Sequence, residues 1–112
     1  MKYYFNLYMD KKIAPNKETI IRKLEHDKWQ LELYLIVLPR NEMNHLEIYN
    51  SALLLQKAVS KEDLFIVGLA SGYHEALNLV EKITREVYDE TSGVDIRNYI
   101  LRKQQEYEEG NV

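Results

Sequence analysis

Residues 63–80 read DLFIVGLASGYHEALNLV, and this stretch decides the fold. Residues 64–70 form an apolar run with the composition of a buried strand. Ser71 and Gly72 interrupt the run, and a helical pattern follows. Its apolar residues recur at helical spacing, which puts one stripe of side chains on one face: Ala76, Val80, Ile83 and Val87, widened by Leu77 and Tyr88. The stretch predicts a strand, a glycine turn and a helix that ends near Gly93.

Two further strands are predicted before this stretch. Residues 3–9 alternate, with Tyr3, Phe5, Leu7 and Met9 on one face and Tyr4 and Tyr8 on the other. Residues 31–38, LELYLIVL, are apolar on both faces and are stopped by Pro39. A strand of this kind is usually covered on both faces, by helices or by another subunit.

Helices are expected on either side of this core. Asn16 can cap a helix over 17–28, and Trp29 at its end is expected to cover the core. Asp95 can cap a final helix, which presents Ile96, Tyr99, Ile100 and Tyr107 along one side.

Residues 41–60 are ambiguous, because a short apolar run such as ALLLQKAV suits a strand or a short helix. Extended structure is favoured over 46–55. The order is then β-α-β-(β)-β-α-α, an α+β two-layer sandwich with a three- or four-stranded sheet. If 51–58 is helical, a small parallel α/β sheet is the alternative. Residues 1–109 form a single domain, and 110–112 are expected to fray.

Composition narrows the classes of function. There is no cysteine, so thiolate metal sites and disulfides are excluded. No apolar run approaches the ~20 residues of a membrane-spanning helix, and a soluble, cytoplasmic protein is expected. Residues 1–40 carry a net charge of +3 and residues 41–112 a net charge of −6. Nucleic-acid binders usually carry a concentrated basic face, so this function is disfavoured.

The glycine turn is a candidate ligand site, formed by Gly68, Ser71, Gly72, Tyr73 and His74. A phosphate site needs backbone N–H groups, a helix N-terminus and often a cation. The turn can provide the first two, but no lysine follows it, and neither glycine-rich nucleotide motif is present. A small-ligand or phosphate-binding domain, or a small enzyme, is therefore the alternative function.

Residues 17–90 also resemble the double-stranded-RNA-binding domain in the order helix, three strands, helix. In that family the last helix follows a glycine-containing turn and a lysine pair. Here Gly68, Glu75 and Ala76 fall at similar places, but Tyr73 and His74 stand where the lysines would be. Those lysines would grip RNA phosphates. The resemblance therefore implies shape, and RNA binding remains a second, disfavoured alternative.

Catalytic and metal sites have little support. No two of the three histidines have the i, i+4 spacing of a helical metal pair, and no serine lies in G-x-S-x-G. The expectation is no metal, no cofactor and no catalytic residue.

Tyrosine is unusually frequent, with nine residues against two phenylalanines. Tyrosine suits half-buried surfaces and is enriched at interfaces. The predicted second sheet face is rich in apolar and aromatic residues: Tyr4, Tyr8, Tyr34, Ile36 and Leu38. Either the final helix covers this face or a second subunit does. The leading hypothesis is a non-enzymatic interaction module that forms a homodimer, with no membrane partner and no assigned small molecule.

Overall fold

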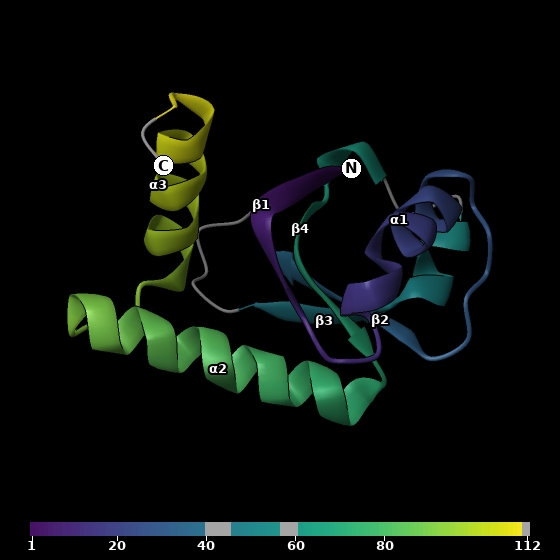
Figure 1. The fold of residues 1–112 in the computed structure, drawn as a ribbon, viewed down its shortest axis with the longest axis horizontal. Coiled ribbons are helices and arrows are strands. Elements are labelled where there is room, and N and C mark those ends of the chain that lie inside the picture. Colours follow the sequence, from purple (N-terminus) through teal and green to yellow (C-terminus); the bar gives the residue numbers. More distant parts are fainter. Residues whose placement is uncertain (40–45, 57–60, 111–112) are drawn as a thin grey trace.

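A four-stranded mixed sheet, in the order β1-β4-β2-β3, forms the centre of the structure (Figure 1). This computed structural model describes residues 1–39, 46–56 and 61–110. The strands are β1 (Lys2–Met9), β2 (Leu33–Leu38), β3 (Glu47–Asn50) and β4 (Phe65–Ser71). β1 is parallel to β4, whereas β2 is antiparallel to both of its neighbours. The predicted α+β fold is confirmed, and the parallel alternative is wrong.

Three α-helices surround the sheet: α1 (Lys17–Glu25), α2 (Tyr73–Thr91) and α3 (Ile96–Glu108). Short 3₁₀ helices span Ala14–Asn16 (η1), Ser51–Leu55 (η2) and Lys61–Asp63 (η3). α2 packs against β4 and β2, while α3 contacts both α2 and β1. Figure 1 shows α1 and α3 toward opposite ends of the molecule.

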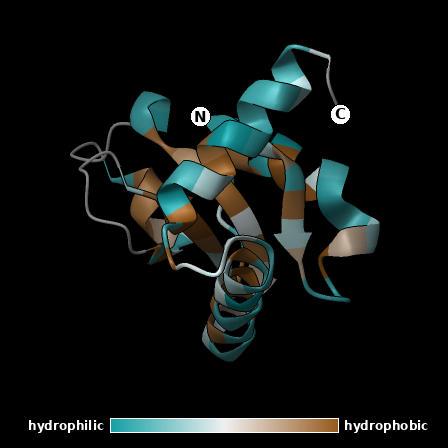
Figure 2. Ribbon diagram, turned by 90° about the vertical axis from the view of Figure 1, so that its left-hand side faces the viewer, coloured by the Kyte–Doolittle hydropathy of each residue, from teal (hydrophilic) through white to brown (hydrophobic). Residues whose placement is uncertain are grey.

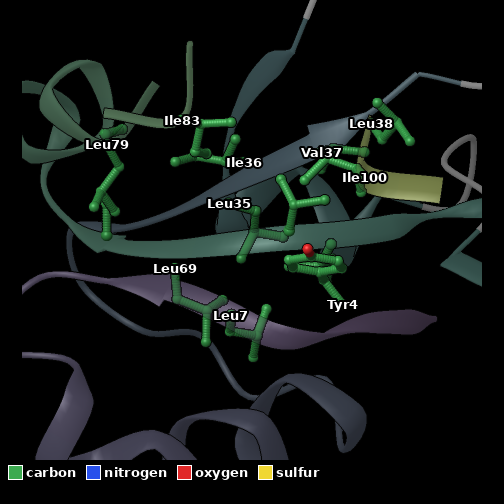
Figure 3. Close-up of a cluster of buried hydrophobic side chains, with 14 of the residues drawn as sticks. Tyr4, Leu7, Leu35, Ile36, Val37, Leu38, Leu69, Leu79, Ile83 and Ile100 are labelled. Atoms are coloured by element: carbon green, nitrogen blue, oxygen red, sulfur yellow. The ribbon is translucent and has the colours of Figure 1, made fainter. Parts of the chain in front are cut away.

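The core occupies both faces of the sheet. Ile36 lies beside Ile83 of α2, whereas Leu7 and Leu69 lie on the other side of the sheet (Figure 3). Hydrophobic residues gather along the strands and the inward sides of the helices (Figure 2). The strand that is apolar on both faces is thus covered within one chain.

α2 and α3 form as predicted, but several of their residues differ from the predicted pattern. The buried stripe of α2 is Ala76, Leu79, Ile83 and Val87. Leu77 and Tyr88 are 45% and 58% exposed, so their predicted burial is wrong. Ser92, and not Gly93, adopts the left-handed conformation at the end of α2, with φ 60°. Asp95 caps α3 as predicted, since its carboxylate accepts from the Asn98 N–H at 3.0 Å.

The segment between α1 and β2 differs most from expectation. The helix ends at Glu25, because Asp27 takes a left-handed φ of 58°. Trp29 is 61% exposed and does not cover the core, and Leu31 is 74% exposed and precedes β2. Asn16 stands at the start of α1, but its side chain makes no capping hydrogen bond. Glu32 has a second left-handed φ, of 56°, so two uncommon backbone conformations bracket the exposed Trp29 and Leu31.

Residues 46–55 are only partly extended. β3 ends at Asn50, whose side-chain oxygen accepts from the Ala52 N–H at 3.0 Å and starts η2. The predicted extended structure is therefore wrong for 51–55. The Asn50 side chain bonds to the backbone two residues on, as Asn often does in turns, and this bond starts the 3₁₀ helix. Residues 57 and 58 of the helical alternative lie outside the described residues, as do 111 and 112 of the tail.

β1 is irregular at its centre. It advances from Tyr3 to Tyr8 while β4 advances only from Ile66 to Gly68, so the strand bulges between these pairs. The Phe5 N–H donates instead to Oε1 of Gln104 on α3, at 2.8 Å. Because of the bulge, Tyr4 and Leu7 are both buried, which breaks the predicted alternation.

Candidate functional site

The clearest candidate site is a depression of about 660 Å³ between β1, α2 and α3, which we call the acidic tyrosine hollow. Its polar lining combines tyrosines with carboxylates and one lysine: Tyr4, Tyr8, Tyr99, Glu86, Asp89, Glu90, Glu106 and Lys103. Phe5 and Asn6 complete the wall. The three elements meet here because α3 turns back over β1 after α2 ends.

Two of the tyrosines are tied to carboxylates across the hollow. The Tyr8 hydroxyl donates to Glu86 at 2.7 Å, and the Tyr99 hydroxyl donates to Glu90 at 2.9 Å. Burial and these hydrogen bonds raise the pKa of Tyr8 above its ordinary range and the pKa of Tyr99 to about 12. Both phenols therefore stay neutral at physiological pH.

Tyr4 differs from these two. Tyr4 as a whole is only 4% exposed, and its ring stacks on that of Tyr8 with centroids 6.2 Å apart. In the part of the chain that the structure describes, no group lies within hydrogen-bond distance of its hydroxyl. No fully buried side-chain oxygen in this part lacks a partner, so the hydroxyl opens into the hollow that it lines. Burial, and then Tyr99, Glu86, Glu90 and Glu106, raise the pKa of Tyr4.

The charge of the hollow is negative. Four carboxylates stand against a single ammonium group, that of Lys103, which lies 3.7 Å from Glu90 and over the ring of Tyr99. Among residues 1–39, 46–56 and 61–110, no group of three His, Cys, Asp or Glu side chains is arranged to hold a metal ion. The hollow thus has the chemistry of a site for an organic cation.

A second hollow, of about 620 Å³, lies beside the predicted glycine turn, and we call it the lysine hollow. Asp10, at the end of β1, accepts from the Ser71 N–H at 2.6 Å and from the Ser71 hydroxyl at 3.0 Å. Lys11, Lys12 and Lys82 line the same hollow. No lysine follows the turn in the sequence, but lysines from other segments lie beside it in the structure. The Ser71 N–H, however, already donates to the Asp10 carboxylate.

The other residues of the glycine turn are spread over two environments. Gly68 is buried in β4, where an added Cβ would meet Ile36 Cδ1 at 3.0 Å and the Tyr8 carbonyl at 3.1 Å. Gly72 precedes α2 with a φ of 130°. Tyr73 and His74 open α2 and are exposed, with Tyr73 packed edge-on against Tyr34.

The predicted interface residues are largely covered by the chain itself. Tyr4, Ile36 and Leu38 are buried, whereas Tyr8 and Tyr34 are half-buried. α2 and α3 form that cover, so assembly through this set of residues stays a prediction. Only Tyr4 and Tyr8 also line the acidic tyrosine hollow.

A third hollow, of about 500 Å³, lies at the end of α1 and is called here the Trp29 surface. It is lined by Arg22, Lys23, His26, Lys28 and Trp29. Sequence reasoning missed both this surface and the carboxylates of the acidic tyrosine hollow. Glu86 and Glu90 are one helical turn apart on either side of the buried Val87, so the sequence could have placed both on the same side of the helix. It could not have shown that tyrosines of β1 and α3 lie opposite them.

No helix in the described ranges is both long enough and apolar enough to cross a membrane. Comparison of this chain with protein-family models, curated proteins and solved structures gave no match.

Proposed function

We propose that this protein is a small, non-enzymatic interaction module that binds a cationic group of a partner, an ammonium or a guanidinium, in the acidic tyrosine hollow. The observation that carries the proposal is the Tyr4 hydroxyl, which opens into the hollow, lacks a partner among the described residues and lies among carboxylates. A ligand that donates a hydrogen bond to this oxygen and to the carboxylates around it gains from several polar contacts at once.

The charge and the rings favour a cation over other ligands. A guanidinium or ammonium can donate to the carboxylates and to the Tyr4 oxygen at the same time. The tyrosine rings add cation–π attraction, as Lys103 already demonstrates over Tyr99 at 5.6 Å. A volume of about 660 Å³ is in the range of ligand sites and accommodates one or two side chains of a partner.

The tyrosine hydroxyls hold the central carboxylates in position to bind a cation. Glu86 and Glu90 each accept a tyrosine hydroxyl at one oxygen, which leaves the other oxygen to accept from a bound ammonium or guanidinium. This supports the interaction module expected from the sequence.

The test is a titration of the protein with N-acetyl-arginine amide, followed by amide chemical shifts in NMR. We expect a Kd of about 1 mM for this minimal probe, with shifts confined to β1, the second half of α2 and α3. The neutral isostere N-acetyl-citrulline amide should not bind. Tyr4→Phe should weaken binding about fivefold, and Tyr107→Phe, an exposed tyrosine outside the hollow, serves as the matched control. Equal shifts with both probes would sink the proposal.

A second candidate function is binding of a small anionic ligand in the lysine hollow. Three lysines converge there from the loop after β1 and from α2. In the described ranges no carboxylate lies within salt-bridge distance of them. Thermal-shift screening with phosphorylated metabolites tests this, since a ligand at 100 times its Kd adds about 2.7 kcal/mol. Lys82→Gln should remove any such shift, and Lys17→Gln should not.

A further inference from the structure

The Trp29 surface exposes side chains that proteins seldom leave in water. Trp29 and Leu31 are 61% and 74% exposed, and Arg22, Lys23 and Lys28 surround Trp29 with positive charge. Trp and Arg are the residue types most enriched at the energetic centres of protein interfaces. This surface is therefore complementary in charge to a surface that carries carboxylates.

Neighbouring carboxylates do not neutralise these three cations. Asp27 pairs with Lys61, and Glu25 accepts the Tyr3 hydroxyl at 2.7 Å. Among the described residues, none lies within salt-bridge distance of Arg22, Lys23 or Lys28. The cations are thus available to a partner.

We infer that the Trp29 surface of one copy docks into the acidic tyrosine hollow of a second copy of this chain. The charges are complementary, because three cations meet four carboxylates that are offset by one lysine. The hollow also offers tyrosine rings and the unpartnered Tyr4 hydroxyl to a guanidinium such as that of Arg22. This inference rests on the proposed function and names its partner.

The two surfaces have no lining residue in common: the Trp29 surface belongs to α1 and the residues after it, and the hollow belongs to β1, α2 and α3 (Figure 1). Their contact therefore joins unlike surfaces of two copies. An interface of this kind, made once between each pair of copies, is head-to-tail, and it propagates into a ring or an open filament.

Sedimentation velocity and tryptophan fluorescence test the inference on the full chain. Trp29 is the only tryptophan, so its emission reports on this surface alone. At about 100–500 μM protein and low salt we expect species larger than a dimer and a blue-shifted emission. Raising the salt from about 0.05 M to about 0.5 M should dissociate them.

Charge reversal separates the two halves of the contact. K23E/K28E should disable the Trp29 surface, and D89K/E106K should disable the hollow without breaking the tyrosine–carboxylate hydrogen bonds. Each variant alone should be monomeric, and their mixture should form a 1:1 complex that does not grow. E62K/E109K, with the same charge change as D89K/E106K but outside both surfaces, should associate like the wild type.

Each failure has a distinct meaning. If N-acetyl-arginine amide binds the hollow but the wild type stays monomeric at all concentrations, the proposed function stands and this inference is overturned. If the protein associates and the mixture of the two variants gives no 1:1 complex, the contact is not head-to-tail.

A monomer that binds anionic lipid vesicles in a manner lost in Trp29→Ala would assign the Trp29 surface to a membrane instead, which also overturns it. Tyr4→Phe should weaken association about fivefold, and an unchanged value would remove the hollow from the contact.

Discussion

The carboxylate of Asp10 joins the ends of two parallel strands by accepting both the backbone N–H and the hydroxyl of Ser71, at 2.6 and 3.0 Å. Its other oxygen accepts from the N–H groups of Lys12 and Ile13. Asp10 thus organises the loop after β1 and the turn before α2 at once. Asp10→Ala should lower the free energy of unfolding by about 2–3 kcal/mol, since hydrogen bonds to a charged group are lost. Urea unfolding measures this, and Glu62→Ala, at an exposed site, should change stability by less than about 0.5 kcal/mol.

Gln104 closes the bulge in β1 and is expected to matter for stability. Its side chain is buried, and its oxygen is the acceptor for the Phe5 N–H. Gln104→Ala should cost about 1–3 kcal/mol, because a backbone donor is left without a partner. Hydrogen exchange of the Phe5 amide should accelerate more than that of its neighbours. Gln105→Ala, at the exposed adjacent position, is the control, and equal effects of the two changes would contradict this role.

Gly68 and Gly93 should respond differently to an added methyl group. At Gly68 the Cβ would press on Ile36 and on the Tyr8 carbonyl, so Gly68→Ala should destabilise the fold by about 1–3 kcal/mol. At Gly93 the nearest atom is 3.7 Å away, and Gly93→Ala should be nearly neutral. Thermal unfolding compares the two directly. A neutral Gly68→Ala would mean that β1 and β4 separate more easily than the register implies.

Gly72 is constrained by its backbone and not by space. No atom lies within 4 Å of a Cβ built there, yet its φ is 130°. Gly72→Ala should therefore cost about 1–3 kcal/mol through strain alone. Chemical unfolding measures this cost, and no shortening of a neighbouring side chain should relieve it. Relief by trimming a neighbour would show that crowding, and not the backbone, is the cause.

Stability should fall at alkaline pH because of the tyrosine–carboxylate pairs. Burial and the bonds to Glu86 and Glu90 raise the pKa of Tyr8 and bring that of Tyr99 to about 12. An unfolded tyrosine loses its proton near pH ~10, so this stabilisation is complete below pH ~10 and is lost as pH rises through the folded values. The slope should reach at most about 1.4 kcal/mol per pH unit per tyrosine. Tyr99→Phe should flatten the profile, and an unchanged slope in this variant would contradict the assignment.

The local sequence pattern predicted most helices and strands correctly. The spacing of apolar residues and the positions of turn and capping residues agree with the tertiary fold. The apolar run before Ser71, the stripe around Ile83 and the cap at Asp95 each depend on neighbours in sequence. The failures lie where one residue adopts an uncommon backbone or where distant segments meet. No pattern indicated that Asp27 would turn left-handed and expose Trp29.

The acidic tyrosine hollow could be predicted from the sequence only in part, for the same reason. The sequence marked Tyr4 and Tyr8 as residues needing cover, but it left open whether that cover was a helix or a subunit. In the structure, α3 packs against β1 and covers these tyrosines only in part. Carboxylates of α2 and α3 are left around the Tyr4 hydroxyl. Such a convergence depends on the angle between α2 and α3, which periodicity does not encode.

The pairing of β1 with β4 also fixes the order in which the chain can fold. Lys2 and Tyr3 pair with Phe65 and Ile66, so β1 cannot complete its pairing until β4 has been synthesised. Contacts so distant in sequence slow folding, since a long loop must close before they form. Until then an aromatic strand stands unpaired, and such a strand is exposed to aggregation.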